Sequence, residues 1–170
     1  AAAAQDLSRF FSQELAAKIT HSDQRIRPGQ GEAREAAILN VDIRGFTGMA
    51  NETDPSDLIR LLSEYESRMV TVIQAHSGNI DKFLGDGILA TFGAALPSQT
   101  YAADATRTID ALHSAIAAWA AERVAAGLTP VPIGMAMVTG RIVFGAVGDE
   151  TRLEYTVIGD PVNFCAKLEK

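Results

Sequence analysis

The sequence has almost no cysteine and no long hydrophobic run. Cys165 is the one cysteine in 170 residues, so the chain cannot form an internal disulfide, and we expect a reducing, cytoplasmic location. No apolar run approaches the ~18 residues that a membrane-spanning helix needs, and the N-terminus lacks the charged and then apolar segments of a secretion signal. We therefore expect a soluble chain, either cytosolic by itself or the cytosolic part of a larger or membrane-attached protein.

Positive charge is also scarce. Fifteen Lys and Arg residues stand against 21 Asp and Glu residues, which gives a formal net charge of −6. A protein that binds the phosphate backbone of a nucleic acid needs a basic excess to displace counterions, so we expect no nucleic-acid partner. Apolar residues are plentiful instead: they make up 47% of the chain, enough for one globular domain with a sizeable core.

The chain divides into a leading segment and a folded domain. Apolar residues recur at helical spacing between residues 7 and 19, which predicts a helix, and the polar stretch 21–34 predicts a mobile connector because it contains Pro28 and Gly29. We therefore place a leading helix and connector at 1–34 and the folded domain at 35–170.

Within the domain, apolar periodicity predicts the order β-α-β-β-α, followed by further strand-like runs and a last helix. We expect strands at 36–43, 79–84, 88–92, 131–138, 142–147 and 153–158, and helices at 54–77, at 100–126 and from residue 160 onward. This order predicts an α+β fold whose core sheet is a split βαβ arrangement of the ferredoxin-like, palm-like type, flanked by helices.

Two aspartates do not fit an apolar core. Asp42 ends an apolar strand and Asp86 lies at a hairpin bend, so a split βαβ sheet can bring the two carboxylates side by side. Buried carboxylates repel each other unless a cation lies between them. Two Mg²⁺ or Mn²⁺ ions about 3.5–4 Å apart suit such oxygen ligands and promote in-line displacement at phosphorus. Taken singly, each aspartate is better explained without a metal, Asp42 as a helix or turn cap and Asp86 as a hairpin residue of the Asp-Gly type.

The segment that follows Asp42 has the composition of a phosphate-binding loop. Glycine lets the backbone approach a ligand closely, so the amides of Gly45, Phe46 and Thr47 are candidates to bind a triphosphate.

A resemblance to a known family rests on three segments, Val41–Thr47, Lys82–Gly87 and Tyr155–Asn163. They resemble, in order, the signature segments of class III adenylate and guanylate cyclases, and the likeness extends from Ala36 to the end of the chain. Each segment alone is a weak signal, whereas three in the correct order are specific. The resemblance implies a lyase of intracellular signal transduction that converts ATP into 3′,5′-cyclic AMP and pyrophosphate.

The resemblance assigns three residues to the metal ions. Asp42 and Asp86 match the two metal-binding aspartates of the family, and Ile43 matches a position whose backbone carbonyl also binds metal. Two divalent cations, Mg²⁺ or Mn²⁺, are the cofactors that this implies.

Four further residues match positions that contact the nucleotide. Lys82 matches the lysine that reads the purine, and Thr156 holds the place of its partner in a large bacterial branch of the family. Asn163 matches the asparagine that orients the ribose. Lys167 falls where the family typically has an arginine that stabilises the pentavalent phosphorus. A lysine ammonium only donates hydrogen bonds, so Lys82 suits the bare N1 of adenine and favours ATP over GTP.

The sequence departs from the family pattern in two places. Lys167 keeps the positive charge of the usual arginine but lacks the planar fork that grips two phosphate oxygens. The chain stops at Lys170, whereas family domains continue through another strand region, so we expect the catalytic domain at 35–170 to be incomplete at its C-terminus. These departures leave an alternative open, a degenerate cyclase-like module that binds nucleotide or dimerises and regulates an attached domain.

The resemblance also implies a partner chain. The family works as a head-to-tail dimer, so we expect a homodimer in which one chain supplies Asp42 and Asp86 to each site and the other supplies the four nucleotide-contacting residues. We further expect the full-length protein to carry an upstream sensor domain.

Overall fold

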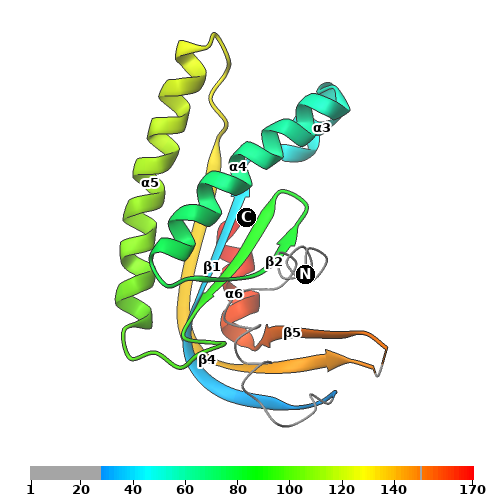
Figure 1. Ribbon diagram of the computed structural model, residues 1–170, viewed down its shortest axis with the longest axis vertical. Coiled ribbons are helices and arrows are strands. Elements are labelled where there is room, and N and C mark those ends of the chain that lie inside the picture. Colours follow the sequence, from blue (N-terminus) through cyan, green and yellow to red (C-terminus); the bar gives the residue numbers. More distant parts are fainter. Residues whose placement is uncertain (1–27, 150) are drawn as a thin grey trace, which may run out of the picture.

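The computed structural model of the protein describes residues 28–149 and 151–170 (Figure 1). The helix expected at 7–19 lies outside these residues. No helix in the described part of the chain is long and apolar enough to cross a membrane.

The centre of the fold is a five-stranded sheet in which every neighbouring pair of strands is antiparallel. Its strands are β1 (Gly31–Ile43), β2 (Asn79–Leu84), β3 (Gly87–Phe92), β4 (Ile133–Gly148) and β5 (Leu153–Ile158), in the spatial order β2-β3-β1-β4-β5. Because β3 lies between β1 and β2, these strands form the split βαβ unit expected from the sequence. The α+β ferredoxin-like prediction is confirmed, with β5 added beside β4.

Helices cover both faces of the sheet (Figure 1). They are α3 (Phe46–Glu52), α4 (Pro55–Ala75), α5 (Tyr101–Ala125) and α6 (Asp160–Glu169). Helices α4 and α5 pack on one face through fully buried side chains such as Tyr65, Leu112 and Trp119, and α6 packs on the other face through Cys165. The sheet is therefore the middle of three layers.

Strand β1 serves both faces because its side chains alternate. Leu39 and Val41 belong to the core beneath α4 and α5, whereas Ile38 belongs to the core beneath α6. Alternation with a period of two places Asp42 on the same face as Ile38. The aspartate that ends the strand thus points toward the layer of α6.

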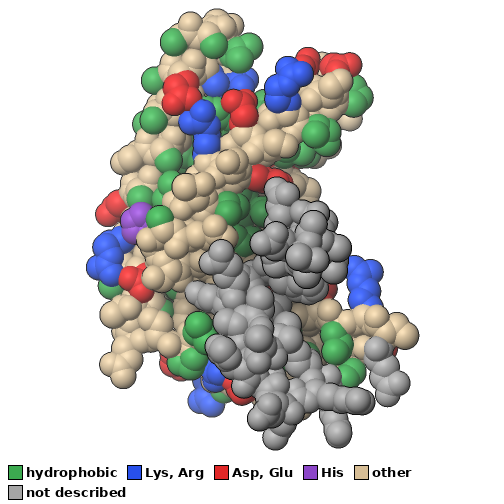
Figure 2. All heavy atoms as spheres, in the orientation of Figure 1, with side chains coloured by type: hydrophobic (Ala, Val, Ile, Leu, Met, Phe, Trp, Pro, Cys, Tyr) green, Lys and Arg blue, Asp and Glu red, His purple; other side chains and the backbone are tan. Residues whose placement is uncertain are grey.

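The outer surface of α4 and α5 carries charges of both signs. Figure 2 shows acidic and basic side chains next to one another over these helices on the face in view. One such pair joins the two helices, since Nη2 of Arg68 donates to Oε2 of Glu122 at 2.6 Å.

Three details of the fold differ from expectation. Strand β1 begins at Gly31, within the expected connector, because its first residues pair with β4. Helix α3 was not expected at all. The strands predicted at 131–138 and 142–147 form one strand, β4, whose pairing with β1 continues through Gly140. Gly140 suggested the end of a strand, but a glycine is needed there because a Cβ would lie 2.7 Å from the Pro161 ring at the start of α6.

Candidate active site

The two predicted metal-binding aspartates meet at the end of β1. Asp86 lies in the tight β2–β3 turn, where Gly85 adopts a left-handed backbone conformation with φ of 64°. From this turn the Asp86 carboxylate accepts a hydrogen bond of 3.0 Å from the backbone N–H of Ile43. Since Ile43 directly follows Asp42, this bond brings the two carboxylates into one site, as the sequence predicted.

A third carboxylate, which the sequence analysis missed, joins this pair. Glu169 in the last turn of α6 has a side chain only 9% exposed, and burial raises its pKa to about 7. The neighbouring Asp42 carboxylate and, more weakly, that of Asp86 contribute to this rise, whereas the Arg44 charge opposes it. The signal was available: Glu169 lies four residues after Cys165 on the apolar side of a predicted helix, so a helical reading places it inward. We call Asp42, Asp86 and Glu169 the carboxylate cluster.

One cation, Arg44, faces this cluster. Its Nη1 lies 3.3 Å from Oε1 of Glu169, an ion pair without hydrogen-bond geometry, and donates to the carbonyl of Lys170 at 3.4 Å. Gly134, the β4 partner of Asp42, makes room for this side chain, because a Cβ there would lie 2.4 Å from Nε of Arg44. Arg44 therefore holds the end of α6 against the end of β1.

The polar groups of the cluster are incompletely satisfied by the protein itself. Oδ1 of Asp42, Oε1 of Glu169 and the hydroxyl of Tyr65 are buried without a hydrogen-bond partner among the described residues. Burial, followed by the charges of Asp86 and Asp42, also raises the pKa of Tyr65. A buried carboxylate oxygen without a partner is costly, and a cation would satisfy it.

The donor set of the site fits a hard divalent cation. It consists of the Asp42 and Asp86 carboxylates and the backbone carbonyl of Ile43, which are oxygen ligands of the kind that Mg²⁺ and Mn²⁺ take. Side chains alone do not complete it, since no group of three or more His, Cys, Asp or Glu residues within 28–149 and 151–170 has the arrangement of a metal site. A cation bound here would therefore need water or a ligand to supply its remaining coordination positions.

The predicted phosphate-binding loop forms the start of α3. Gly45 precedes the helix with φ of 69°, in the left-handed region, and no side chain caps the helix. Phe46 and Thr47 open its first turn, where backbone N–H groups have no partner inside the helix. Their binding of a triphosphate stays a prediction.

The two predicted purine-reading residues lie together although they come from opposite edges of the sheet. Lys82 is on β2 and Thr156 on β5, and a buried acid, Asp81, joins them. The Thr156 hydroxyl donates to Oδ2 of Asp81 at 3.2 Å, and Nζ of Lys82 lies 3.6 Å from the same oxygen. Lys82 also donates to Oε1 of Glu154 at 2.8 Å. We call these four side chains the base-site network.

A β-bulge in β2 explains how neighbouring residues both reach this network. The pairing of β2 with β3 skips one position, because Ile80 pairs with Ala90 and Lys82 pairs with Leu89. Asp81 is the extra residue, and such a bulge redirects side chains that would otherwise point to opposite faces. The sequence analysis missed Asp81. Its adjacency to Lys82 was visible, but nothing in the alternation of β2 showed the bulge.

Burial and pairing shift the pKa values of the network in opposite directions. The side chain of Asp81 is 2% exposed, and burial raises its pKa to about 6, although the Lys82 charge and the Thr156 hydrogen bond oppose this. Burial would lower the pKa of Lys82, but the Glu154 hydrogen bond and the charge of Asp81 outweigh it and raise that pKa. Lys82 thus stays charged at neutral pH.

The two predicted catalytic residues of α6 face away from the carboxylate cluster. Asn163 and Lys167 are exposed and one turn apart, whereas Cys165 and Glu169 are buried against the sheet. Residues two apart on a helix differ by about 200° in direction, so the exposed and buried pairs point to opposite sides. Within the described part of the chain, no hydrogen bond or ion pair joins Asn163 or Lys167 to Asp42 or Asp86. One chain does not bring all predicted site residues together.

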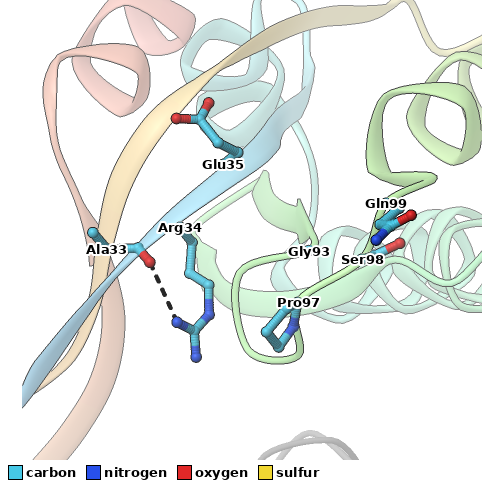
Figure 3. A pocket seen from close by; sticks show the side chains of 7 residues that line it. All are labelled: Ala33, Arg34, Glu35, Gly93, Pro97, Ser98 and Gln99. Atoms are coloured by element: carbon cyan, nitrogen blue, oxygen red, sulfur yellow. Dashed lines mark hydrogen bonds between the residues drawn. The ribbon is translucent and has the colours of Figure 1, made fainter.

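A separate hollow of about 420 Å³ lies between the start of β1 and the segment after β3 (Figure 3). Arg34 lines it together with Glu35 and Ser98, but its guanidinium is engaged by the Ala33 carbonyl at 3.3 Å and by Glu32. None of the predicted site residues lines this hollow.

The chain is similar in sequence to known proteins. A sequence model of the family described as "Adenylate and Guanylate cyclase catalytic domain" matches residues 30–170. The chain is 36% identical over 160 residues to an uncharacterized protein of Mycobacterium tuberculosis, which is 94% of this chain and 28% of that protein. It is 33% identical over 156 residues to an adenylate cyclase of Anabaena cylindrica, which is 86% of this chain and 29% of that protein. The chain therefore spans less than a third of either relative.

A solved structure extends the similarity to three dimensions. The crystal structure of the guanylyl cyclase Cya2 is 35% identical and superimposes with a TM-score of 0.76, covering 82% of this chain and 71% of that one.

Proposed function

The chain belongs to the adenylate and guanylate cyclase catalytic domain family, and from this premise we propose that it is an adenylate cyclase. The proposed reaction converts ATP into 3′,5′-cyclic AMP and pyrophosphate by in-line attack of the ribose 3′-oxygen on the α-phosphorus. The observation that carries the proposal is the hydrogen bond of 3.0 Å from the backbone N–H of Ile43 to Asp86, because it supports a shared location for Asp86 and the end of β1 that carries Asp42. Carboxylate and carbonyl oxygens are ligands that divalent cations take.

The choice of ATP over GTP rests on the base-site network rather than on the relatives, which include proteins named adenylate cyclase and guanylyl cyclase. Lys82 donates to the bare N1 of adenine and is mismatched to the protonated N1 of guanine. Thr156 accepts from the exocyclic amine of adenine. A site that reads guanine would instead need an acidic acceptor where Lys82 stands.

In the proposed mechanism the protein acts mainly by positioning and electrostatics. Asp42, Asp86 and the Ile43 carbonyl would hold Mg²⁺ or Mn²⁺, and ions held there would supply the positive charge that favours ionisation of the attacking hydroxyl and binding of the triphosphate. The amides of Gly45, Phe46 and Thr47 bind phosphate oxygens.

Two side chains of α6 complete the mechanism. Asn163 orients the ribose so that its 3′-oxygen is in line with the α-phosphorus, and Lys167 offsets the negative charge that builds up in the transition state.

The proposed working unit is a homodimer with composite sites. Asp42 lies behind α6 while Asn163 and Lys167 project from its exposed side, so a single chain leaves each set without the other. A second copy supplies what is lacking. Phe164 and Leu168 support this arrangement, because each is 53% exposed beside the two polar residues and offers apolar surface to a partner.

The proposed setting is intracellular signal transduction in the cytoplasm. The chain spans 28% of the Mycobacterium tuberculosis relative and 29% of the Anabaena cylindrica one, which leaves room in such proteins for an upstream sensor domain. We extend this arrangement, with a leading segment at 1–34 and a catalytic domain at 35–170, to the full-length form of this protein.

The second candidate function is a cyclase-like module that binds nucleotide or dimerises without turnover, and Lys167 favours it because a point charge replaces the usual fork. Incubating the purified chain with ATP and Mn²⁺ separates the two. The proposal expects cyclic AMP and pyrophosphate in equal amounts, detected by chromatography. Nucleotide binding without either product would establish the second candidate.

A further inference from the structure

The base-site network contains an acid that cannot touch a bound base. The side chain of Asp81 is 2% exposed, beneath Thr156 and Lys82, so a nucleotide meets Thr156 and not the acid. The bulge in β2 places it there, and Thr156 is held in turn by the pairing of β5 with β4 opposite Gly145. The contact is therefore built into the sheet.

The hydrogen bond between these residues has a defined direction. A carboxylate has acceptor oxygens and no proton, so the Thr156 hydroxyl must be the donor in its 3.2 Å bond to Oδ2 of Asp81. A threonine hydroxyl has one proton. Once that proton is directed at Asp81, only the lone pairs of Oγ1 remain for a ligand.

We propose that Asp81 is a positioning residue that sets base preference by forcing the Thr156 hydroxyl to act as an acceptor toward the purine. This inference rests on the proposed function, which places Lys82 and Thr156 beside the base. The exocyclic amine of adenine donates to such an acceptor. The carbonyl oxygen at the same position of guanine has nothing to accept from Thr156, and two acceptors face each other.

Lys82 keeps Asp81 ionised, the form in which the carboxylate accepts the hydrogen bond from the Thr156 hydroxyl. Its ammonium lies 3.6 Å from the carboxylate and opposes protonation of the buried acid. The hydrogen bond of Lys82 to the exposed Glu154 uses one of three ammonium protons, so a donor remains for the N1 of adenine. The network thus presents one donor and one acceptor to the base, the pattern that adenine complements.

The test compares equilibrium binding of 3′-deoxy-ATP and 3′-deoxy-GTP, which lack the attacking hydroxyl and so bind without turnover. Asp81→Asn keeps the shape of the side chain but adds amide protons that can donate to Thr156 and free its hydroxyl to donate to guanine. We expect this variant to lower the adenine-over-guanine binding ratio by roughly tenfold, the worth of about one hydrogen bond. Asp81→Glu, which remains acceptor-only, should keep more of the ratio, and the exposed Asp110→Asn should leave it unchanged.

A second background distinguishes positioning from general damage. In Thr156→Val the hydroxyl is gone, so adding Asp81→Asn should not change the ratio further, whereas a loss of structure weakens both nucleotides equally in either background. An unchanged ratio in Asp81→Asn, or the same shift with and without the Thr156 hydroxyl, overturns the proposal.

The outcome separates this inference from the proposed function. If the ratio shifts as expected but ATP yields no cyclic AMP, the role of Asp81 stands and the catalytic proposal fails. If cyclic AMP forms while Asp81→Asn leaves the ratio unchanged, only the role of Asp81 fails. If the parent protein binds neither nucleotide, both fail.

Discussion

The carboxylate cluster and the base-site network are two charged regions of one sheet, and they are built in opposite ways. In the cluster, three acids lie together and a single described cation, Arg44, faces them, with Oδ1 of Asp42 left without a partner. In the network, the acids Asp81 and Glu154 both lie within ion-pair distance of Lys82. The first region leaves negative charge without matching cations among the described residues, whereas in the second region the acids are paired with a lysine of the same chain. The comparison shows that charge balance differs sharply between two regions of the same domain.

The largest expected effect comes from the cluster. Asp42→Ala or Asp86→Ala should lower turnover by about 10³-fold or more, since each removes a ligand of the cations on which the chemistry depends. Because the like-charged acids repel each other without cations, Asp42→Ala should not lower the free energy of unfolding of the metal-free protein. Asp86→Ala should lower it modestly, since the Ile43 N–H loses its acceptor. Product formation and thermal unfolding in metal-free buffer measure the two effects. Full activity in either variant contradicts the metal assignment.

The next effect concerns Lys167, which belongs neither to the carboxylate cluster nor to the base-site network. Lys167→Ala should slow turnover by about 10²–10³-fold, as expected for loss of one transition-state donor. Lys167→Arg should retain or raise turnover, because a bidentate donor fits phosphate oxygens better than a point charge. Steady-state rates with ATP at saturation give the comparison. An alanine variant as fast as the parent would move Lys167 out of the site.

Substitutions in the base-site network should change the preference between ATP and GTP more than they change the rate of turnover. Lys82→Glu replaces the donor that faces N1 of the purine with an acceptor, so kcat/KM should shift from ATP toward GTP. Sites that leave buried polar groups unpaired discriminate by up to ~10⁴-fold, and we expect less here because Lys82 is partly exposed. A parent that prefers GTP, or an unchanged ratio in Lys82→Glu, contradicts this assignment.

The smallest expected effect is a dependence of base choice on pH. The pKa of Asp81 is raised to about 6, so the acid is ionised at pH 8 and largely protonated at pH 5. A protonated Asp81 can donate to Thr156 and release the hydroxyl, so the adenine-over-guanine binding ratio should fall as pH drops through 6. The charged groups that face Asp81, Lys82 and Glu154, keep their charges across this window, because the pKa of Lys82 is raised and that of Glu154 lowered. The ratio in Asp81→Asn should show no such step.

The contrast also shows what the sequence could reveal. The order of elements and the meeting of Asp42 with Asp86 followed from apolar periodicity and a Gly-Asp-Gly turn, which are local signals. Lys82 and Thr156 were paired by family resemblance alone. The sequence analysis missed Glu169 of the carboxylate cluster and Asp81 of the base-site network.

The reasons for these misses are physical. Helical spacing from Cys165 turns Glu169 inward, but its position beside Asp42 arises only when α6 folds against β1, a contact between residues far apart in the chain. Asp81 depended on a β-bulge, which shifts the register by one residue and leaves no mark on a six-residue strand such as β2. The continuous β4 was misjudged because Gly140 makes room for Pro161 rather than ending a strand.

The central claim is that the cluster of one chain works with the base-site residues and α6 surface of another. Mixing Asp42→Ala chains with Lys167→Ala chains tests it most directly, because the homodimers of either variant have both sites defective and only the heterodimer has one intact site. With random exchange of subunits, half of the dimers are heterodimers, so the account predicts that cyclic AMP formation recovers to about a quarter of the unmutated rate. Heterodimers that form, as seen by native mass spectrometry, yet make no cyclic AMP would contradict the account.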